Sequence, residues 1–223
     1  MKNLLMFKIL ITLLFITIQI EPQNANANDV INHVMNILKC SQEDAVTFIG
    51  FIEDRVDKIQ NNISKIASHN TNDSVKNMLI QNTVNDLFLG PSSWIQVSSL
   101  NRNSLRTYYI NEYLKSLSKL SKNSYTKVEL YFVRDYLTLG RIYPCEHEEY
   151  GNAFEFNVSM WQIFSAGPGD SISYEDATLK VLGFIFYKPN RSSHWNLRVK
   201  NIAVKETVSI SDIEAEFGRS LLR

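Results

Sequence analysis

The feature of the sequence that most constrains the fold is the stretch from Phe154 to Val208, where three long apolar segments follow one another. In the first segment, apolar and polar residues alternate as far as Met160, and this period of two is typical of a half-buried β-strand. The second and third segments, Thr178–Tyr187 and Trp195–Val208, are set apart by links rich in Gly, Pro, Asn and Ser. The pattern predicts three successive antiparallel strands that form one wall of the core.

The alternation changes phase after Met160, because the apolar residues Trp161, Ile163 and Phe164 then follow in close succession. An extra residue inserted into one strand of a pair shifts the alternation in this way and bends the strand. We therefore expect a bulge or a strong bend near Trp161.

Helices are predicted for the first half of the chain, since apolar residues recur there at intervals of three and four. The Ser41–Asp44 segment has the composition of a helix start, with a capping serine followed by acidic residues. The apolar seam of the helix that begins there packs either on the chain's own sheet or against a partner's helix, and we expect the first. The predicted helices are 29–39, 42–66, 74–88 and 105–120, with a short strand at 94–97.

From Tyr125 onward the period of the apolar residues changes to two. Two strands are predicted at 125–132 and 137–142, followed by a polar loop at 144–151 and then the three long strands. Helices come first and strands afterwards, which indicates an α+β fold with the N-terminal helices packed on an antiparallel sheet.

The N-terminus has the order of a secretory signal peptide, with a basic start, an apolar run at 9–20 and the small-residue motif Ala25-Asn26-Ala27. We expect cleavage after Ala27, giving a signal peptide at 1–27 and export to the periplasm or the extracellular space. The alternative is an uncleaved membrane anchor, although the apolar run is shorter than the roughly 20 residues of a spanning helix. The remainder is predicted to be a single domain, 28–208, with a helical extension at 29–40 and a C-terminal tail at 209–223.

Charge and cysteine content bound the possible functions. The chain carries 23 basic and 23 acidic residues, so its formal net charge is zero. Nucleic-acid binding needs a surplus of Lys and Arg to neutralise phosphates, and this composition disfavours it. The two cysteines, Cys40 and Cys145, either pair as a disulfide, as exported proteins permit, or remain free thiols.

The order of the predicted elements resembles that of the nuclear-transport-factor-2-like superfamily. Its leading helices correspond to Ile49–Ile66 and Val75–Phe88, its first strand to Trp94–Val97, its third helix to Leu105–Leu120, and its long strands to Tyr125–Val208. The resemblance rests on topology and includes no diagnostic motif. It implies a cone-like α+β fold with a curved sheet and a concave pocket, which the superfamily uses in isomerases, dehydratases, ligand-binding modules and secretion components.

Two residues are weak candidates for a catalytic base. Asp176 lies in the polar set Tyr174-Glu175-Asp176 with Lys180, and enzymes of this superfamily often place an Asp or His in the pocket; a solvated turn is the more ordinary interpretation. His147 lies in the acidic segment 145–149, which lacks the ligand spacing of a zinc site. No phosphate-binding glycine motif or nucleophile elbow occurs, so we expect no metal and no cofactor.

Four aromatic residues are candidates for lining a ligand pocket: Phe156, Trp161, Phe184 and Trp195. Aromatic residues at strand alternation more commonly belong to the core. Together the patterns predict an exported, non-catalytic binding module for a protein partner or a small apolar ligand. The alternatives are a pocket enzyme of the isomerase or dehydratase type, and a periplasmic component of a secretion machine if the N-terminus stays in the membrane.

Overall fold

The structure, a computed structural model, describes residues 27–120, 125–168, 171–189 and 195–218. Its helices are α2 (Ala27–Leu38), α3 (Gln42–Ala67), α4 (Asp73–Asn82), the short π-helix η1 (Thr83–Leu87), α5 (Ile110–Leu117) and α7 (Ile210–Phe217). Its strands are β1 (Trp94–Ser99), β2 (Arg102–Tyr109), β3 (Lys127–Leu139), β4 (Tyr143–His147), β5 (Gly151–Gly167), β6 (Tyr174–Tyr187) and β7 (Asn196–Val208).

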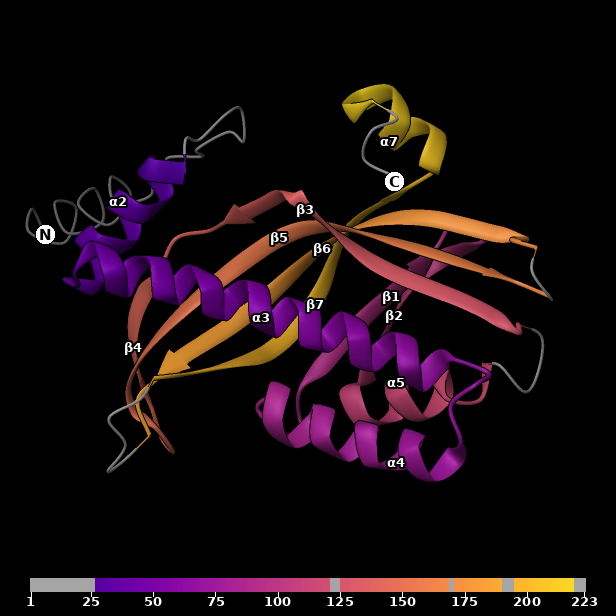
Figure 1. Cartoon of the computed structure of the whole chain (residues 1–223), viewed down its shortest axis with the longest axis horizontal. Coiled ribbons are helices and arrows are strands. Elements are labelled where there is room, and N and C mark those ends of the chain that lie inside the picture. Colours follow the sequence, from indigo (N-terminus) through magenta and orange to yellow (C-terminus); the bar gives the residue numbers. More distant parts are fainter. Residues whose placement is uncertain (1–26, 121–124, 169–170, 190–194, 219–223) are drawn as a thin grey trace, which may run out of the picture.

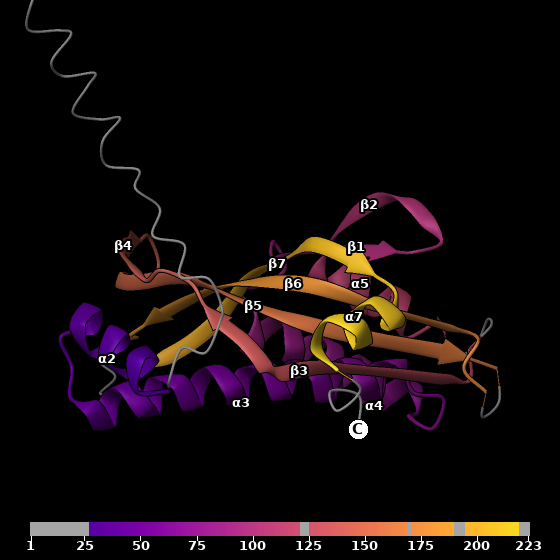
Figure 2. The same cartoon turned by 90° about the horizontal axis from the view of Figure 1, so that it is seen from above.

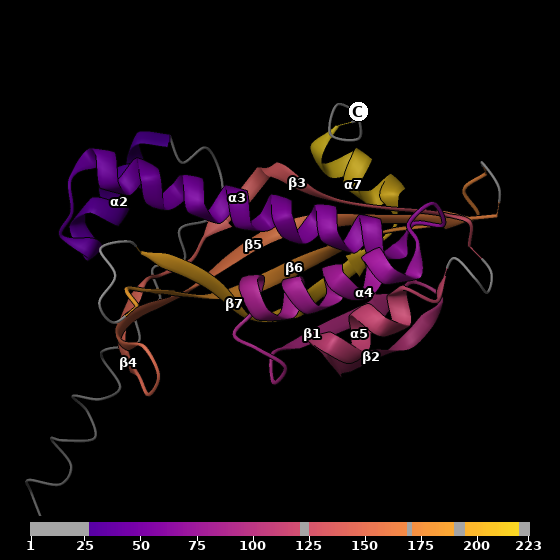
Figure 3. The ribbon, with the colours of Figure 1, turned by 60° about the horizontal axis from the view of Figure 1, so that its bottom comes forward.

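The strands form one curved sheet in the order β2-β1-β7-β6-β5-β3, and β4 pairs with β5 beyond the end of β3. Helices α3, α4 and α5 cover one face of this sheet (Figure 3), and α7 lies apart from them near the C-terminus (Figure 1). Neighbouring strands are antiparallel except β1 and β7, which are parallel. The predicted α+β fold is thus confirmed, although the sheet is mixed because β1 adds to β7 in the parallel direction.

The centre of the sheet is the pairing of β5 with β6, which continues without a break through fourteen residue pairs from Ala153↔Tyr187 to Ala166↔Tyr174. Strand β7 pairs with the other edge of β6, so the three predicted strands are confirmed. Because side chains alternate between faces, this register decides which residues meet the helices. The even-numbered residues of β5 and β6, among them Phe156 and Phe184, face the main core under α3.

Helix α3 is 26 residues long and supplies much of that core. It starts with a capping box, in which the Ser41 hydroxyl accepts a hydrogen bond from the Asp44 backbone N–H at 3.1 Å. Phe48 packs edge-on against Phe156 and Phe186, with ring centroids 5.1 and 4.8 Å away. The apolar seam of α3 is therefore buried by the chain's own sheet, as expected.

The phase change at Trp161 has a different cause from the predicted bulge. Strand β5 pairs regularly with β6 through this region, and the register shift lies in the neighbouring strand β3, between Val133 and Thr138. Met160 faces the main core, whereas Trp161 packs on the opposite face in a second cluster that includes Ile213 of α7. The run of apolar residues reflects a strand that is covered on both faces.

The predicted helix at 105–120 is wrong in its first part. Residues 105–109 belong to β2, which pairs with β1 as an antiparallel hairpin, and the helix α5 begins only at Ile110. Thr107, Tyr108 and Tyr109 favour strands, and their pairing with β1 outweighs a weak helical periodicity. The backbone N–H of Ile110 then bonds to the Ser93 carbonyl at 2.8 Å, where the helix starts.

The region after Tyr125 also differs from the prediction. Strand β3 is continuous from Lys127 to Leu139, where two separate strands were expected. The expected loop at 144–151 contains β4, which pairs with the first residues of β5. Pro144 is compatible with this strand because β4 is an edge strand that pairs with β5, and edge strands tolerate a residue that has no backbone N–H to donate.

The two ends of the chain differ in what the structure describes. The predicted signal peptide lies outside the described residues, apart from Ala27 at the start of α2. Among the described residues, no helix is long and apolar enough to cross a membrane. The segment predicted as a C-terminal tail contains α7, whose start is capped by the Ser209 hydroxyl and whose Ile213 is buried on the sheet.

Replacement of Phe48 by alanine tests the role of α3. Phe48 is 1% exposed, so truncation should lower the free energy of unfolding by about 3–5 kcal/mol, through lost burial and a residual cavity. The measurement is urea denaturation followed by circular dichroism. Val46→Ala is the control on the same helix: Val46 is 50% exposed, and its truncation should change stability by less than about 0.5 kcal/mol. Equal effects of the two substitutions would contradict this account of the core.

Candidate functional site

A buried polar cluster lies at the start of β6, on the same face of the sheet as the main core. Tyr174, Asp176 and Lys180 occupy alternate positions of the strand and so point to one side. Asp176 is 3% exposed and Lys180 is 2% exposed. The interpretation of this segment as a solvated turn is therefore wrong: Tyr174 and Asp176 pair with β5, and Lys180 pairs with both β5 and β7, so the sheet continues through these polar residues.

Hydrogen bonds connect the cluster to β1. The Tyr174 hydroxyl donates to the Asp176 carboxylate, and it accepts from the Leu100 backbone N–H at 3.1 Å. The Ser99 hydroxyl lies 2.7 Å from the same Tyr174 oxygen. Lys180 Nζ donates to the Gln96 backbone carbonyl at 2.9 Å. Because β7 lies between β6 and β1 in the sheet, the side chains of β6 cross β7 to make these contacts.

Burial changes the proton affinities of the two charged groups in the cluster. Burial raises the pKa of the Asp176 carboxyl, while the Tyr174 hydrogen bond and the Lys180 charge act in the opposite direction. Burial lowers the pKa of Lys180 from its ordinary 10.5 to about 8, and the Asp176 charge offsets part of this change. A group that titrates near neutral pH suits acid–base chemistry, but buried ion pairs that are only structural have the same property.

A second feature is a cavity of about 440 Å³ at the β1–β2 hairpin, called the hairpin groove below. Its lining comes from β1, β2 and the first turn of α5: Trp94, Gln96, Thr107, Tyr108, Tyr109 and Glu112. Trp94 pairs with Tyr109 and Gln96 pairs with Thr107, so these four side chains share one face of the hairpin. Ile95 and its partner Tyr108 pack against the core, so these four side chains lie on the face turned away from it, while Tyr108 contributes to the lining from the other face.

Gln96 belongs to both features. Its backbone carbonyl accepts the hydrogen bond of Lys180, and its side-chain carbonyl accepts one from the Val204 backbone N–H at 3.0 Å while it lines the hairpin groove. The buried cluster thus fixes the strand on which the groove is built. Sequence reasoning missed the groove because residues 105–109 were assigned to a helix; the signal present was the alternation Trp94-x-Gln96 in a predicted strand.

The second candidate base, His147, lies far from Asp176. His147 ends β4 and pairs with Gly151 of β5, whereas Asp176 pairs with Phe164, thirteen residues further along β5 and roughly 40 Å away along the strand. The His147 ring stacks on Tyr150 with centroids 4.6 Å apart, and its Nδ1 accepts from the Glu149 N–H at 3.2 Å. The structure therefore does not bring the two candidates into one site.

The four aromatic residues proposed for a pocket also separate. Phe156 and Phe184 stack on each other, with centroids 5.4 Å apart, inside the main core. Trp161 lies on the opposite face of the sheet, beneath α7. Trp195 is 40% exposed and stacks on Phe186 with centroids 4.5 Å apart. These four residues therefore do not line one pocket.

The cysteines and possible metal ligands define no site. Cys40 follows α2 and Cys145 lies in β4, and both are free thiols whose pKa is raised, chiefly by burial. Within the described residues, no three side chains of His, Cys, Asp or Glu are grouped as metal ligands would be.

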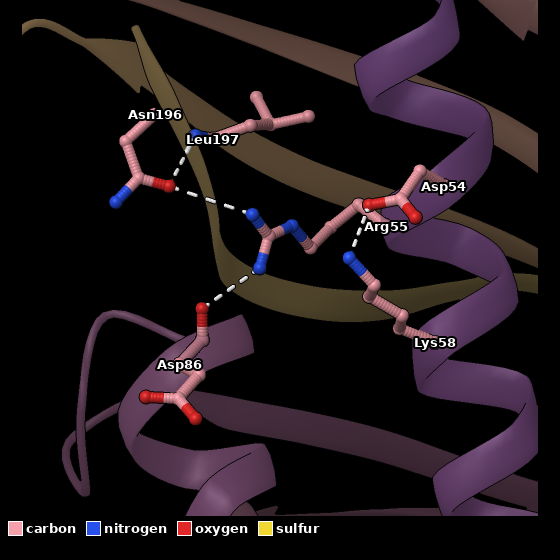
Figure 4. Close-up of polar contacts among 6 residues, drawn as sticks. All are labelled: Asp54, Arg55, Lys58, Asp86, Asn196 and Leu197. Carbon is pink, nitrogen blue, oxygen red and sulfur yellow. Dashed lines mark hydrogen bonds and ion pairs between the residues drawn. The ribbon is translucent and has the colours of Figure 1, made fainter. Parts of the chain in front are cut away.

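Arg55 of α3 makes the contacts drawn in Figure 4. Its Nη1 donates to the Asp86 carbonyl of η1 at 2.8 Å, and its Nη2 lies 3.4 Å from the Asn196 side-chain oxygen of β7. Burial lowers the pKa of Arg55. The neighbouring Lys58–Asp54 ion pair, 2.7 Å long, is exposed and adds little stability. Because Arg55 bonds to a backbone carbonyl and an amide, we assign it to holding α3, η1 and β7 together.

The order of helices and strands and the curved sheet form the cone-like α+β arrangement that the sequence resemblance implied. No protein-family profile matches the sequence, and no curated protein sequence matches it.

Solved structures with similar folds are distant in sequence. A Novosphingobium aromaticivorans protein described as a scytalone dehydratase aligns with a TM-score of 0.40 and 9% identity, covering 76% of this chain and 91% of that one. The type 2 hexachlorocyclohexane dehydrochlorinase LinA aligns with a TM-score of 0.40 and 11% identity, and the alignment covers 75% of this chain and 92% of LinA. A protein from N. aromaticivorans described as an aromatic ring hydroxylase aligns with a TM-score of 0.37 and 9% identity, and the alignment covers 78% of this chain and 97% of that protein. These values carry no activity over to this chain.

The lowered pKa of Lys180 predicts a pH dependence of stability. Between about pH 8 and about pH 10 the unfolded chain holds the Lys180 proton while the folded chain has lost it, so stability must rise with pH. The free energy of unfolding should increase by roughly 3 kcal/mol over this range relative to Lys180→Met. Urea denaturation at several pH values measures the difference.

Lys205→Met is the matched control, because Lys205 is an exposed lysine of β7. It should keep the pH dependence of the unmodified chain. The same pH dependence in Lys180→Met and in the unmodified chain would contradict a buried lysine of lowered pKa.

Proposed function

We propose that this protein is a non-catalytic binding module and that a small ligand with an apolar or aromatic body occupies the hairpin groove. The observation that carries the proposal is the groove itself: a cavity of about 440 Å³ whose lining includes three aromatic residues, Trp94, Tyr108 and Tyr109. The volume of this surface groove falls within the range of small-molecule sites. The concave face of the sheet, where Phe156 and Phe184 lie, is instead packed against α3.

Export is the second part of the proposal, and the N-terminal sequence supports it. Met1–Ala27 has the order of a cleavable signal peptide, so we propose that the mature chain begins at Asn28 outside the cytoplasm. Mass spectrometry of the protein from its native cells gives the N-terminus directly. A retained N-terminal segment would favour the membrane-bound alternative, a component of a secretion machine.

A catalytic function is the second candidate, because burial raises the pKa of the Asp176 carboxyl as a general base requires. We place it second because a base must come within hydrogen-bond distance of its substrate, and Asp176 is 3% exposed beneath Tyr174. Labelling of carboxylates with a carbodiimide, followed by mass spectrometry, distinguishes the binding module from the enzyme. Asp176 should stay unlabelled while exposed carboxylates react, and rapid labelling of Asp176 in the folded protein would favour the enzyme.

The hairpin groove is tested with phenylnaphthylamine, a neutral dye whose fluorescence rises in apolar surroundings. Binding should be saturable, and Tyr109→Ala should weaken it by up to about tenfold, since an aromatic contact contributes about 0.5–1.5 kcal/mol. Tyr109 is 57% exposed, so its truncation should leave the fold intact.

Tyr143→Ala is the matched control for the dye experiment. Tyr143 is 51% exposed and lies on β4, outside the groove, so its removal should not change dye affinity. Non-saturable binding, or equal effects of the two substitutions, would overturn the proposed site.

A further inference from the structure

The charge of the hairpin groove restricts what it can bind. Of the six described residues that line it, Glu112 is the one acidic residue, and the other five are aromatic or neutral polar residues. Glu112 is exposed in the first turn of α5, and within the described part of the chain its carboxylate forms no ion pair or hydrogen bond. The groove therefore presents one unpaired negative charge next to aromatic rings.

We propose that the hairpin groove binds an organic cation, with an ammonium group against the rings of Trp94 and Tyr109 and paired with the Glu112 carboxylate. The inference rests on the proposed binding function and specifies the class of ligand. An ammonium group is attracted to the negative face of an aromatic ring, most strongly to that of tryptophan. Trp94 and Tyr109 are direct partners across the hairpin, which places both side chains on one face.

The same geometry argues against other ligand classes. An anion would meet the Glu112 carboxylate, and the described lining residues include no lysine or arginine to compensate. A neutral apolar ligand that covered Glu112 would remove water from the carboxylate without replacing its hydrogen bonds, which costs free energy. A cation is the class of ligand that offsets this cost.

The groove also has polar groups beside its aromatic rings. Gln96 is held by its bond from the Val204 N–H, and the Thr107 side chain is exposed next to it. Both offer hydrogen bonds to a hydroxyl or amide on the ligand. The volume of about 440 Å³ exceeds that of a trimethylammonium group, so the cation should carry a further substituent.

Choline and its neutral isostere dimethylbutanol, in which carbon replaces the quaternary nitrogen, test the charge alone. Binding is followed by proton–nitrogen NMR of the Trp94 indole group, assigned with Trp94→Phe. Choline should bind about tenfold more tightly than dimethylbutanol, and added salt should weaken choline binding only. Glu112→Gln should remove most of this preference, whereas Glu53→Gln, which removes an exposed carboxylate from α3, should preserve it.

The outcomes separate this inference from the proposed function. Equal binding of choline and dimethylbutanol, or a preference for choline that survives Glu112→Gln, would overturn the cation site while dye binding still supports the groove. Dye binding without any choline binding would overturn it too. Failure of the dye and both small ligands to bind would overturn the proposed function itself.

Discussion

The unbroken pairing of β5 with β6 is the constraint on which the rest of the structure depends. Fourteen consecutive pairs without a register shift fix the facing of every side chain along both strands. If β5 or β6 slipped by one residue, its even-numbered side chains would leave the main core and turn to the face covered by α7. Among the described residues, the register shifts lie elsewhere: in β3, at two points where β7 pairs with β6, and between β1 and β2. The centre is thus regular and the curvature is taken up around it.

This regularity places polar residues where a core would otherwise continue. Toward the start of β6 the core face changes from Phe184 and Leu182 to Lys180 and Asp176, with no break in the pairing with β5. Buried charges need partners: Lys180 donates to the Gln96 carbonyl of β1, and Asp176 accepts from Tyr174, whose hydroxyl contacts Ser99 of β1. A polar cluster at one end of the sheet therefore specifies which hairpin docks there, and the hairpin in turn carries the groove on its other face.

The sequence predicted the parts of this arrangement that depend on local periodicity. The long strands and α3 have strong patterns, and burial follows those patterns. Other parts depend on contacts between distant residues: β2 is a strand because it pairs with β1, and Trp161 is buried because Ile213 covers it. Asp176 was assigned to a solvated turn because three polar residues in a row look like a loop, and only the pairing partners of β6 show otherwise. The hairpin groove combines two such non-local features, so no linear pattern revealed it.

The attachment of the β1–β2 hairpin has a consequence for the dynamics of the molecule. Strand β1 joins β7 through the pairs Trp94↔Asn201 and Ile95↔Ile202, and past these the hairpin projects from the sheet (Figure 2). Beyond that point the side chains of Tyr174 and Lys180 hold it. Local opening is easiest where few backbone bonds must break, so this hairpin should exchange its amide hydrogens before β5 and β6 do.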